Sequence, residues 1–284
     1  MDLDWAYFRR LYEDLLDHDG DRHRFLADRR GTAAAHLAEL APLRRRERIP
    51  PGGYTGDDEQ LWRIMKLYAL SRVSDYLIEL RPEDGAPRTR FFTEIGLTPF
   101  EHAEAFSPFH HEIVAVVQDP NATRVTVEEV LWPGFWFGDL LFSRAGVRVR
   151  APRHLIDAAV ATTSTLYFTF RREPRPTDDL SHGWGSNSQW RTSFHRFYAD
   201  EDGLHLNWDG EIDIGEDPPH SLAGRPPNET PLDERRELLL HRCFVRTALP
   251  HDEHDRFPYD DRLTLATAEW PLPPESIVRT PRPA

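Results

Sequence analysis

Residues 194–208 read FHRFYADEDGLHLNW, and this stretch decides the fold class. Apolar and polar side chains alternate on both sides of Asp202-Gly203, with Leu204 and Leu206 on the second arm. Alternation with a period of two is typical of strands, and an Asp-Gly pair between two such arms is typical of a hairpin turn. The stretch therefore predicts two antiparallel strands joined by a short turn.

Further strands are predicted on both sides of this hairpin. The same alternation occurs over residues 111–117, 147–150 and 166–171. Pro133-Gly134 interrupts an aromatic stretch, and it predicts a turn between two buried segments. The chain beyond residue 85 is therefore expected to be rich in strands.

The chain before residue 80 has the period of a helix instead. Apolar side chains recur every three or four residues in two segments, which indicates amphipathic helices. The first stripe is Trp5, Phe8, Tyr12 and Leu15, and the second is Trp62, Met65, Ala69, Val73, Tyr76 and Leu80. The second stripe predicts a helix over residues 57–80 whose aromatic side chains lie in the core.

One further helix is predicted to begin at Thr230, which is followed by a proline and two acidic residues. Helices, then strands, then one helix indicate an α+β fold. We expect a helical N-terminal region, residues 1–85, packed on an antiparallel β-rich core, residues 86–284, that carries the C-terminal helix. A barrel and a jelly roll are the candidate arrangements of that core, and the two regions are expected to form one compact unit.

Composition excludes several classes of function. The chain of 284 residues has a formal net charge of −13, which opposes binding to nucleic acids and anionic membranes. It contains one cysteine, Cys243, and no apolar run long enough to span a bilayer. The N-terminus lacks the pattern of a signal peptide. We therefore expect a cytoplasmic protein that acts on a small-molecule substrate, whereas the sequence does not indicate its oligomeric state.

Residues 181–193 read SHGWGSNSQWRTS, a combination of small polar residues with two tryptophans. Loops held rigidly by a scaffold are common places for binding and catalysis. Trp184 and Trp190 are expected to be buried, to fix this loop and to line a cofactor pocket.

A metal site is predicted from histidine and carboxylate spacing. His110 and Glu112 are two residues apart at the start of a predicted strand, so both are expected on one face. A third ligand is expected from His182 in the 181–193 loop. Two histidines and one carboxylate are the facial triad that holds Fe(II) and leaves positions open for oxygen and substrate.

The five residues His110, Glu112, His182, Arg191 and Ser193 resemble the pattern of the iron-dependent oxygenases of the 2-oxoglutarate and isopenicillin-synthase type. The pattern differs in having Glu112 where aspartate is commoner. The resemblance implies Fe(II) as cofactor, and it implies that Arg191 and Ser193 bind a substrate carboxylate as the catalytic pair. The functional hypothesis is accordingly a metal-dependent enzyme of small-molecule metabolism, a non-haem iron oxygenase.

Other histidines offer alternative ligands, namely His195, His205, His251 and His254. A different class of function also fits the same loop. In this alternative the protein is a metal-free module that binds a partner protein through the tryptophan-rich loop, because tryptophan and arginine are enriched at interface hot spots. A metal assay on the purified protein distinguishes the two hypotheses.

Overall fold

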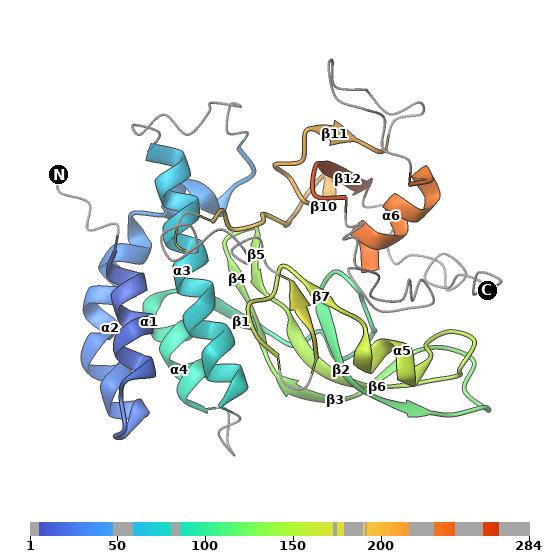
Figure 1. The fold of residues 1–284 in the computed structure, drawn as a ribbon, viewed down its shortest axis with the longest axis horizontal. Coiled ribbons are helices and arrows are strands. Elements are labelled where there is room, and N and C mark those ends of the chain that lie inside the picture. The colour runs from blue at the N-terminus through green and yellow to red at the C-terminus, as the bar shows by residue number, and fades with distance from the viewer. Residues whose placement is uncertain are drawn as a thin grey trace.

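The N-terminal helices form one layer of the molecule, shown at the left of Figure 1. The computed structural model describes residues 6–47, 59–80, 86–172, 175–178, 190, 192–215, 230–241 and 258–266. In this layer it has α1 (Tyr7–Leu16), α2 (Arg22–Ala38), the 3-10 helix η1 (Ala41–Arg44), α3 (Glu59–Glu79) and α4 (Ala86–Ile95). Because α4 packs against α2, the layer extends beyond residue 85.

Helix α3 belongs to this layer and is buried on nearly all sides from Ile64 onward. It confirms the helix predicted over residues 57–80. Met65 and Val73 are buried as expected, but Trp62 is only half-buried because it lies in the first turn, before the enclosed part of the helix. None of the described helices combines the length and apolar character needed to cross a membrane.

The largest sheet has seven strands in the order β1-β4-β5-β9-β10-β12-β11. Its strands are β1 (Thr98–Phe100), β4 (Gly134–Phe137), β5 (Leu140–Ser143), β9 (Tyr198–Asp200), β10 (Gly203–Leu206), β11 (Ile212–Asp213) and β12 (Asp261–Ala266). The predicted hairpin is present as β9 and β10, with Gly203 opposite Asp200. Gly203 has a φ of 140°, which a residue with a side chain rarely adopts.

A second sheet has the order β2-β6-β3. It consists of β2 (His111–Gln118), β3 (Thr126–Trp132) and β6 (Ala145–Ala151), and α5 (Ala158–Thr163) packs against β2. The remaining described elements are the pair β7 (Leu166–Tyr167) and β8 (Thr177–Asp178), and α6 (Leu232–His241) in the region of the predicted C-terminal helix.

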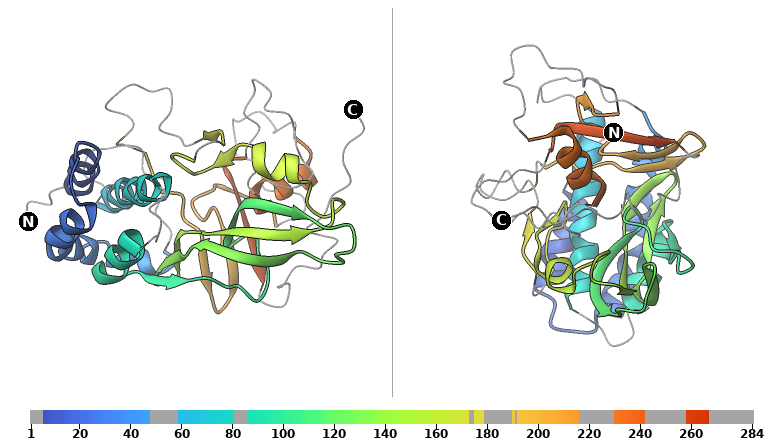
Figure 2. Two further views of the ribbon diagram at one scale, coloured as in Figure 1. Left: turned by 90° about the horizontal axis from the view of Figure 1, so that it is seen from below. Right: turned by 90° about the vertical axis from the view of Figure 1, so that its right-hand side faces the viewer.

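The α+β class is confirmed, but the sheets are mixed rather than purely antiparallel. β2 and β6 are parallel, as are β11 with β12 and β7 with β8. No barrel closes among the described strands, because the seven-stranded sheet ends at β1 and β11 without pairing them. Figure 2 shows the sheets beside the helical layer from two further directions.

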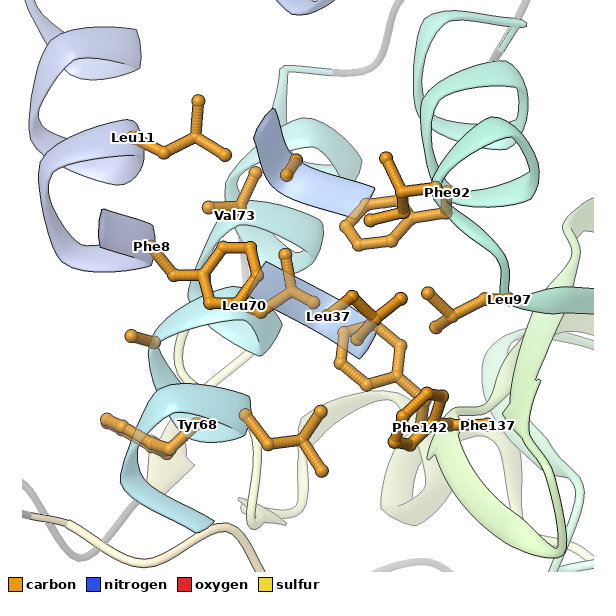
Figure 3. Packing of buried hydrophobic residues seen from close by; sticks show 14 of the residues in the cluster. Phe8, Leu11, Leu37, Tyr68, Leu70, Val73, Phe92, Leu97, Phe137 and Phe142 are labelled. Carbon is orange, nitrogen blue, oxygen red and sulfur yellow. The ribbon is translucent and has the colours of Figure 1, made fainter. Parts of the chain in front are cut away.

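The helical layer packs on β4 and β5 through a continuous apolar core (Figure 3). Leu70 and Val73 of α3 and Phe92 of α4 are fully buried in it, together with Phe137 of β4. Burying one such side chain contributes roughly 1.5–3 kcal/mol. This core fixes α3 against β5, and the site described next lies along that contact.

Candidate functional site

A cleft lies between α3, β5 and the two connecting segments 168–172 and 192–197. Its volume is about 70 Å³. A water molecule needs roughly 10–15 Å³ of such space, so the cleft holds a few waters or one small polar group. Its wall is partly aromatic and partly polar, and the polar side chains include Ser74, Asp75, Glu112, Ser143, Arg172 and His195.

One face of α3 supplies the polar groups on the helical side of the cleft. Ser74 and Asp75 lie three and four residues after Ser71, so all three share a face of the helix. The same helix places Leu70 and Val73 in the apolar core. Helix α3 therefore joins the core to the cleft.

An ion pair network crosses the cleft from α3 to β2 through Arg172. The Nε and Nη2 groups of Arg172 donate to Oε1 and Oε2 of Glu112 at 2.9 and 3.2 Å. Nη1 of Arg172 lies 2.9 Å from Oδ1 of Asp75. The other oxygen of Asp75 accepts a hydrogen bond from the backbone N–H of Phe170 at 2.9 Å. One guanidinium thus binds two buried carboxylates from different layers.

The network sets the charges in the cleft. Burial works against ionised Glu112, but Arg172 and Arg144 outweigh it and lower the pKa of Glu112. Burial raises the pKa of Asp75, and Arg172 offsets only part of that effect. Burial also opposes the charge on Arg172, yet Asp75 and Glu112 together raise its pKa above the ordinary value.

Arg88 of α4 lies behind the cleft wall and has only neutral hydrogen-bond acceptors. It donates to Ser74 Oγ at 3.0 Å, to Ser143 Oγ at 2.7 Å and to the carbonyl of Pro133 at 2.8 Å. Burial, with the charge of Arg172 adding to it, lowers the pKa of Arg88 to about 9. It remains a cation at neutral pH, in direct contact with two hydroxyl groups that line the cleft.

Phe168 and His195 form the opposite wall. Their ring centroids are 3.8 Å apart, and the ring planes are inclined by 32°. Phe168 has a φ of 58°, in the left-handed region that bulky residues avoid. Backbone strain of this kind is found preferentially at binding and catalytic sites. His195 Nδ1 lies 3.4 Å from Asn207 Oδ1, so the ring is held from a second side.

Trp190 anchors the segment that leads to the cleft. Its indole is buried against Tyr12 of α1, with ring centroids 5.6 Å apart. The buried guanidinium of Arg72 lies 4.5 Å from the Trp190 ring and 3.6 Å from the Phe170 ring. The prediction that Trp190 is buried is therefore confirmed.

The structure brings Glu112 and Ser193 to the same cleft. Three of the predicted site residues, Trp184, His182 and Arg191, lie outside the described residues. His251 and His254 lie outside them too.

His110 and His111 have structural partners at the start of β2. The ring of His110 packs against His102, with centroids 4.4 Å apart, and its Nδ1 lies 2.8 Å from Ser107 Oγ. His111 Nδ1 accepts from the N–H of Ser107 at 3.0 Å, and Nε2 lies 2.9 Å from the carbonyl of Glu101. Burial lowers the pKa of His111 to about 4, so it is neutral at physiological pH.

The predicted iron site is therefore not assembled from its described members. Both oxygens of Glu112 are bound by Arg172, and His110 lies among aromatic rings. Within the described ranges, no group of three or more His, Cys, Asp and Glu side chains is arranged to hold a metal ion. The hypothesis depends on His182 and stays a prediction.

Sequence reasoning did not identify Asp75, Arg88 or Arg172. A signal was present for Asp75, because Ser71, Ser74 and Asp75 place three polar side chains on one face of α3. Arg88 and Arg172 carried no comparable signal, since they are two among many arginines and their partners are distant in sequence.

Comparisons with known proteins add little to this geometry. No family model matches the chain, and no solved structure matches it. One curated protein, Protein GrpE 2 of Streptomyces avermitilis, is 51% identical over 51 residues. That match covers 17% of this chain and 25% of the curated protein, so the chain spans about a quarter of the relative's length. The match is too short to show a family.

Proposed function

We propose that this protein binds a small molecule with a carboxylate or phosphate group, and that the group occupies the cleft beside Ser74 and Ser143. The observation that carries the proposal is the contact of Arg88 with both hydroxyls. A serine hydroxyl has one proton to donate and two acceptor lone pairs. Because Arg88 occupies a lone pair on each oxygen, both protons remain for an acceptor in the cleft. Oxygen atoms of an anion are the strongest acceptors of this kind.

The charges of the described residues favour the same ligand. Arg88 and Arg144 are buried beside the cleft and Arg172 is largely buried in it, against the two carboxylates of Asp75 and Glu112. Three guanidinium groups against two carboxylates leave a net positive charge, and net charge of one sign in a narrow cleft attracts ligands of the opposite sign. The volume of about 70 Å³ limits the enclosed part of the ligand to a small group.

His195 adds a group that can exchange protons in the same cleft. Imidazole is the side chain whose ordinary pKa allows this near neutral pH. An anion bound next to an imidazole is an arrangement that enzymes of small-molecule metabolism use. We propose that His195 is the general acid or base of such an enzyme.

The iron-dependent enzyme remains a second candidate, because Glu112 and Ser193 line one cleft. Glu112 would have to exchange Arg172 for the metal ion, and His182 would have to complete the site. Anaerobic incubation with Fe(II) followed by dialysis tests it: about one retained equivalent, lost in His182→Ala, supports this candidate, and no retained iron removes it. The metal-free module that binds a partner protein through the tryptophan-rich loop 181–193 also stays a proposal.

Calorimetric titration with acetate, succinate and phosphate tests the anion proposal, with succinamide as the uncharged analogue. The wild-type protein should bind at least one of the anions and should not bind succinamide. The double variant Ser74→Ala/Ser143→Ala should lose most of that affinity. Ser71→Ala is the matched control, because the Ser71 hydroxyl already donates to the carbonyl of Tyr68 at 2.7 Å. Equal affinity in all three proteins, or no anion binding at all, would overturn the proposal.

A further inference from the structure

A second polar cluster lies on the seven-stranded sheet, where β9, β10 and β12 are neighbours. His205 of β10 is at its centre and is buried. Thr264 is the residue opposite it on β12, and its side chain is exposed. Asp200 lies at the end of β9. None of the three lines the cleft described above.

The hydrogen bonds of His205 connect the two other side chains. Nε2 of His205 lies 2.9 Å from Asp200 Oδ1, and Nδ1 lies 3.0 Å from Thr264 Oγ1. Burial works against ionised Asp200, but its hydrogen bonds, first with His205 and then with the N–H of Asp202, outweigh burial and lower its pKa.

An ionised carboxylate only accepts hydrogen bonds, so Nε2 of His205 carries the proton. In the tautomer with its proton on Nε2, Nδ1 is an acceptor, and the Thr264 hydroxyl donates to it. The three groups are ordered as carboxylate, imidazole and hydroxyl. This order of roles activates a hydroxyl nucleophile in enzymes on unrelated folds.

We propose that Thr264 is a nucleophile activated by His205 and Asp200, and that it accepts the acyl group of an activated ester or thioester. Its exposed side chain can be reached from solvent. Among the described strands, β11 pairs with β12 only at Asp261 and Arg262, so it does not extend alongside Thr264. This second site is independent of anion binding in the cleft.

Arg46 provides a positive charge at the same place. Its Nη1 lies 3.5 Å from His205 Nδ1, the atom that Thr264 contacts. Its Nε donates to Asp200 Oδ2 at 2.8 Å, and its Nη2 is bound to Asp202. A fixed cation beside the attacked carbonyl stabilises the oxyanion that forms in acyl transfer.

The step is an ordinary acyl transfer. The Thr264 oxygen attacks the carbonyl carbon while its proton passes to His205 Nδ1. The bond between that carbon and the leaving oxygen or sulfur breaks, and the leaving group departs as the anion or takes the proton from His205. The product is an ester of Thr264. Attack by water, with His205 again as base, releases the acid and restores the hydroxyl.

The probe for this site is p-nitrophenyl acetate. Its reaction is measured by the release of p-nitrophenolate, and the acetylated residue is located by peptide mass spectrometry. We expect one acetyl group on the peptide that contains Thr264, retained in Thr264→Ser and absent in Thr264→Ala. General-base catalysis contributes about 10²–10⁴-fold, so His205→Gln should slow acetylation by about 10²-fold or more. Thr163→Ala is the matched control, because this exposed threonine donates only to the carbonyl of Ala159.

Asp200→Asn tests the positioning residue through the pH profile. Asp200→Asn removes the carboxylate that orients His205, so the acetylation rate should fall and its dependence on pH should differ from that of the wild type. Thermal unfolding of each variant distinguishes chemistry from a purely structural role. Acetylation that avoids Thr264, or that continues unchanged in a folded Thr264→Ala protein, overturns the proposal.

Discussion

Arg172 holds Glu112 through two parallel hydrogen bonds, from Nε to Oε1 at 2.9 Å and from Nη2 to Oε2 at 3.2 Å. The third contact of the same guanidinium reaches Asp75 on α3. The side chain of Arg172 therefore connects the helical layer to the β2-β6-β3 sheet. Removing that side chain leaves two carboxylates buried without their cation.

Arg172→Ala should lower the free energy of unfolding by about 3–5 kcal/mol, because breaking a buried ion pair leaves uncompensated charge. Arg171→Ala is the control: Arg171 is half exposed and pairs with Glu79 at 2.9 Å, and exposed pairs contribute about 0–1 kcal/mol. Urea denaturation of both variants measures the difference. Equal losses would show that the network contributes no more than a surface pair.

Trp190→Ala should lower the free energy of unfolding by about 3–5 kcal/mol, since Trp190 is buried between α1 and α3. Trp62→Ala should cost less, because Trp62 is only half-buried in the first turn of α3. Thermal and urea unfolding of the two variants compare these costs. A larger loss in Trp62→Ala would contradict the packing described for Trp190.

Stability at alkaline pH should depend on Tyr198. Burial raises its pKa to about 12 from an ordinary value of 10.0. A raised pKa means that the folded state favours the protonated phenol, so this contribution is complete below pH ~10 and is lost as pH rises toward ~12. At about 1.4 kcal/mol per pKa unit, the loss is roughly 3 kcal/mol.

The measurement is unfolding by urea at several alkaline pH values in the wild type and in Tyr198→Phe. The variant should be less stable at neutral pH, because Arg196 and the carbonyl of Leu43 lose a partner. Its stability should nevertheless fall less steeply between pH ~10 and ~12. Parallel curves for the two proteins would rule out Tyr198 as the source of the alkaline loss.

Gly203→Ala should disturb the pairing of β10 with β12. Gly203 has a φ of 140°, and a Cβ there would collide with the backbone oxygen of Leu265. The strain should lower the melting temperature and weaken the contact between His205 and Thr264 on the same strands. Gly31→Ala is the opposite case, because nothing lies within 4 Å of a Cβ at this helical position. It should be neutral or stabilising.

The sequence predicted those parts of the fold that depend on local periodicity. The helix over 57–80 and the hairpin around Asp202-Gly203 are present because their side-chain patterns match one regular element. The parallel pairing of β2 with β6 was not predicted, since it joins segments that are not neighbours in sequence. Alternation shows which residues share a face, but it contains no information about the neighbouring strand.

The candidate site was predicted only in part, for the same reason. Glu112 and Ser193 were selected from motif spacing and lie in the cleft. Their partners were missed because each comes from a different element: Arg88 from α4, Asp75 from α3 and Arg172 from the segment after β7. The chain has a single lysine and many arginines, so a buried arginine cannot be told from an exposed one in the sequence. Arg88 and Arg172 are recognised only from their contacts.

Because α3 is enclosed by its neighbours, the helical wall of the cleft is already in place before a ligand binds. A helix buried on nearly all sides cannot turn about its axis without moving Leu70 and Val73 out of the core. Ser74 and Asp75 are therefore held in one orientation before any ligand arrives. Such preorganisation removes much of the ordering entropy that binding would otherwise cost. Substitutions in the apolar core beneath α3 should accordingly weaken ligand affinity, even where they touch no residue of the cleft.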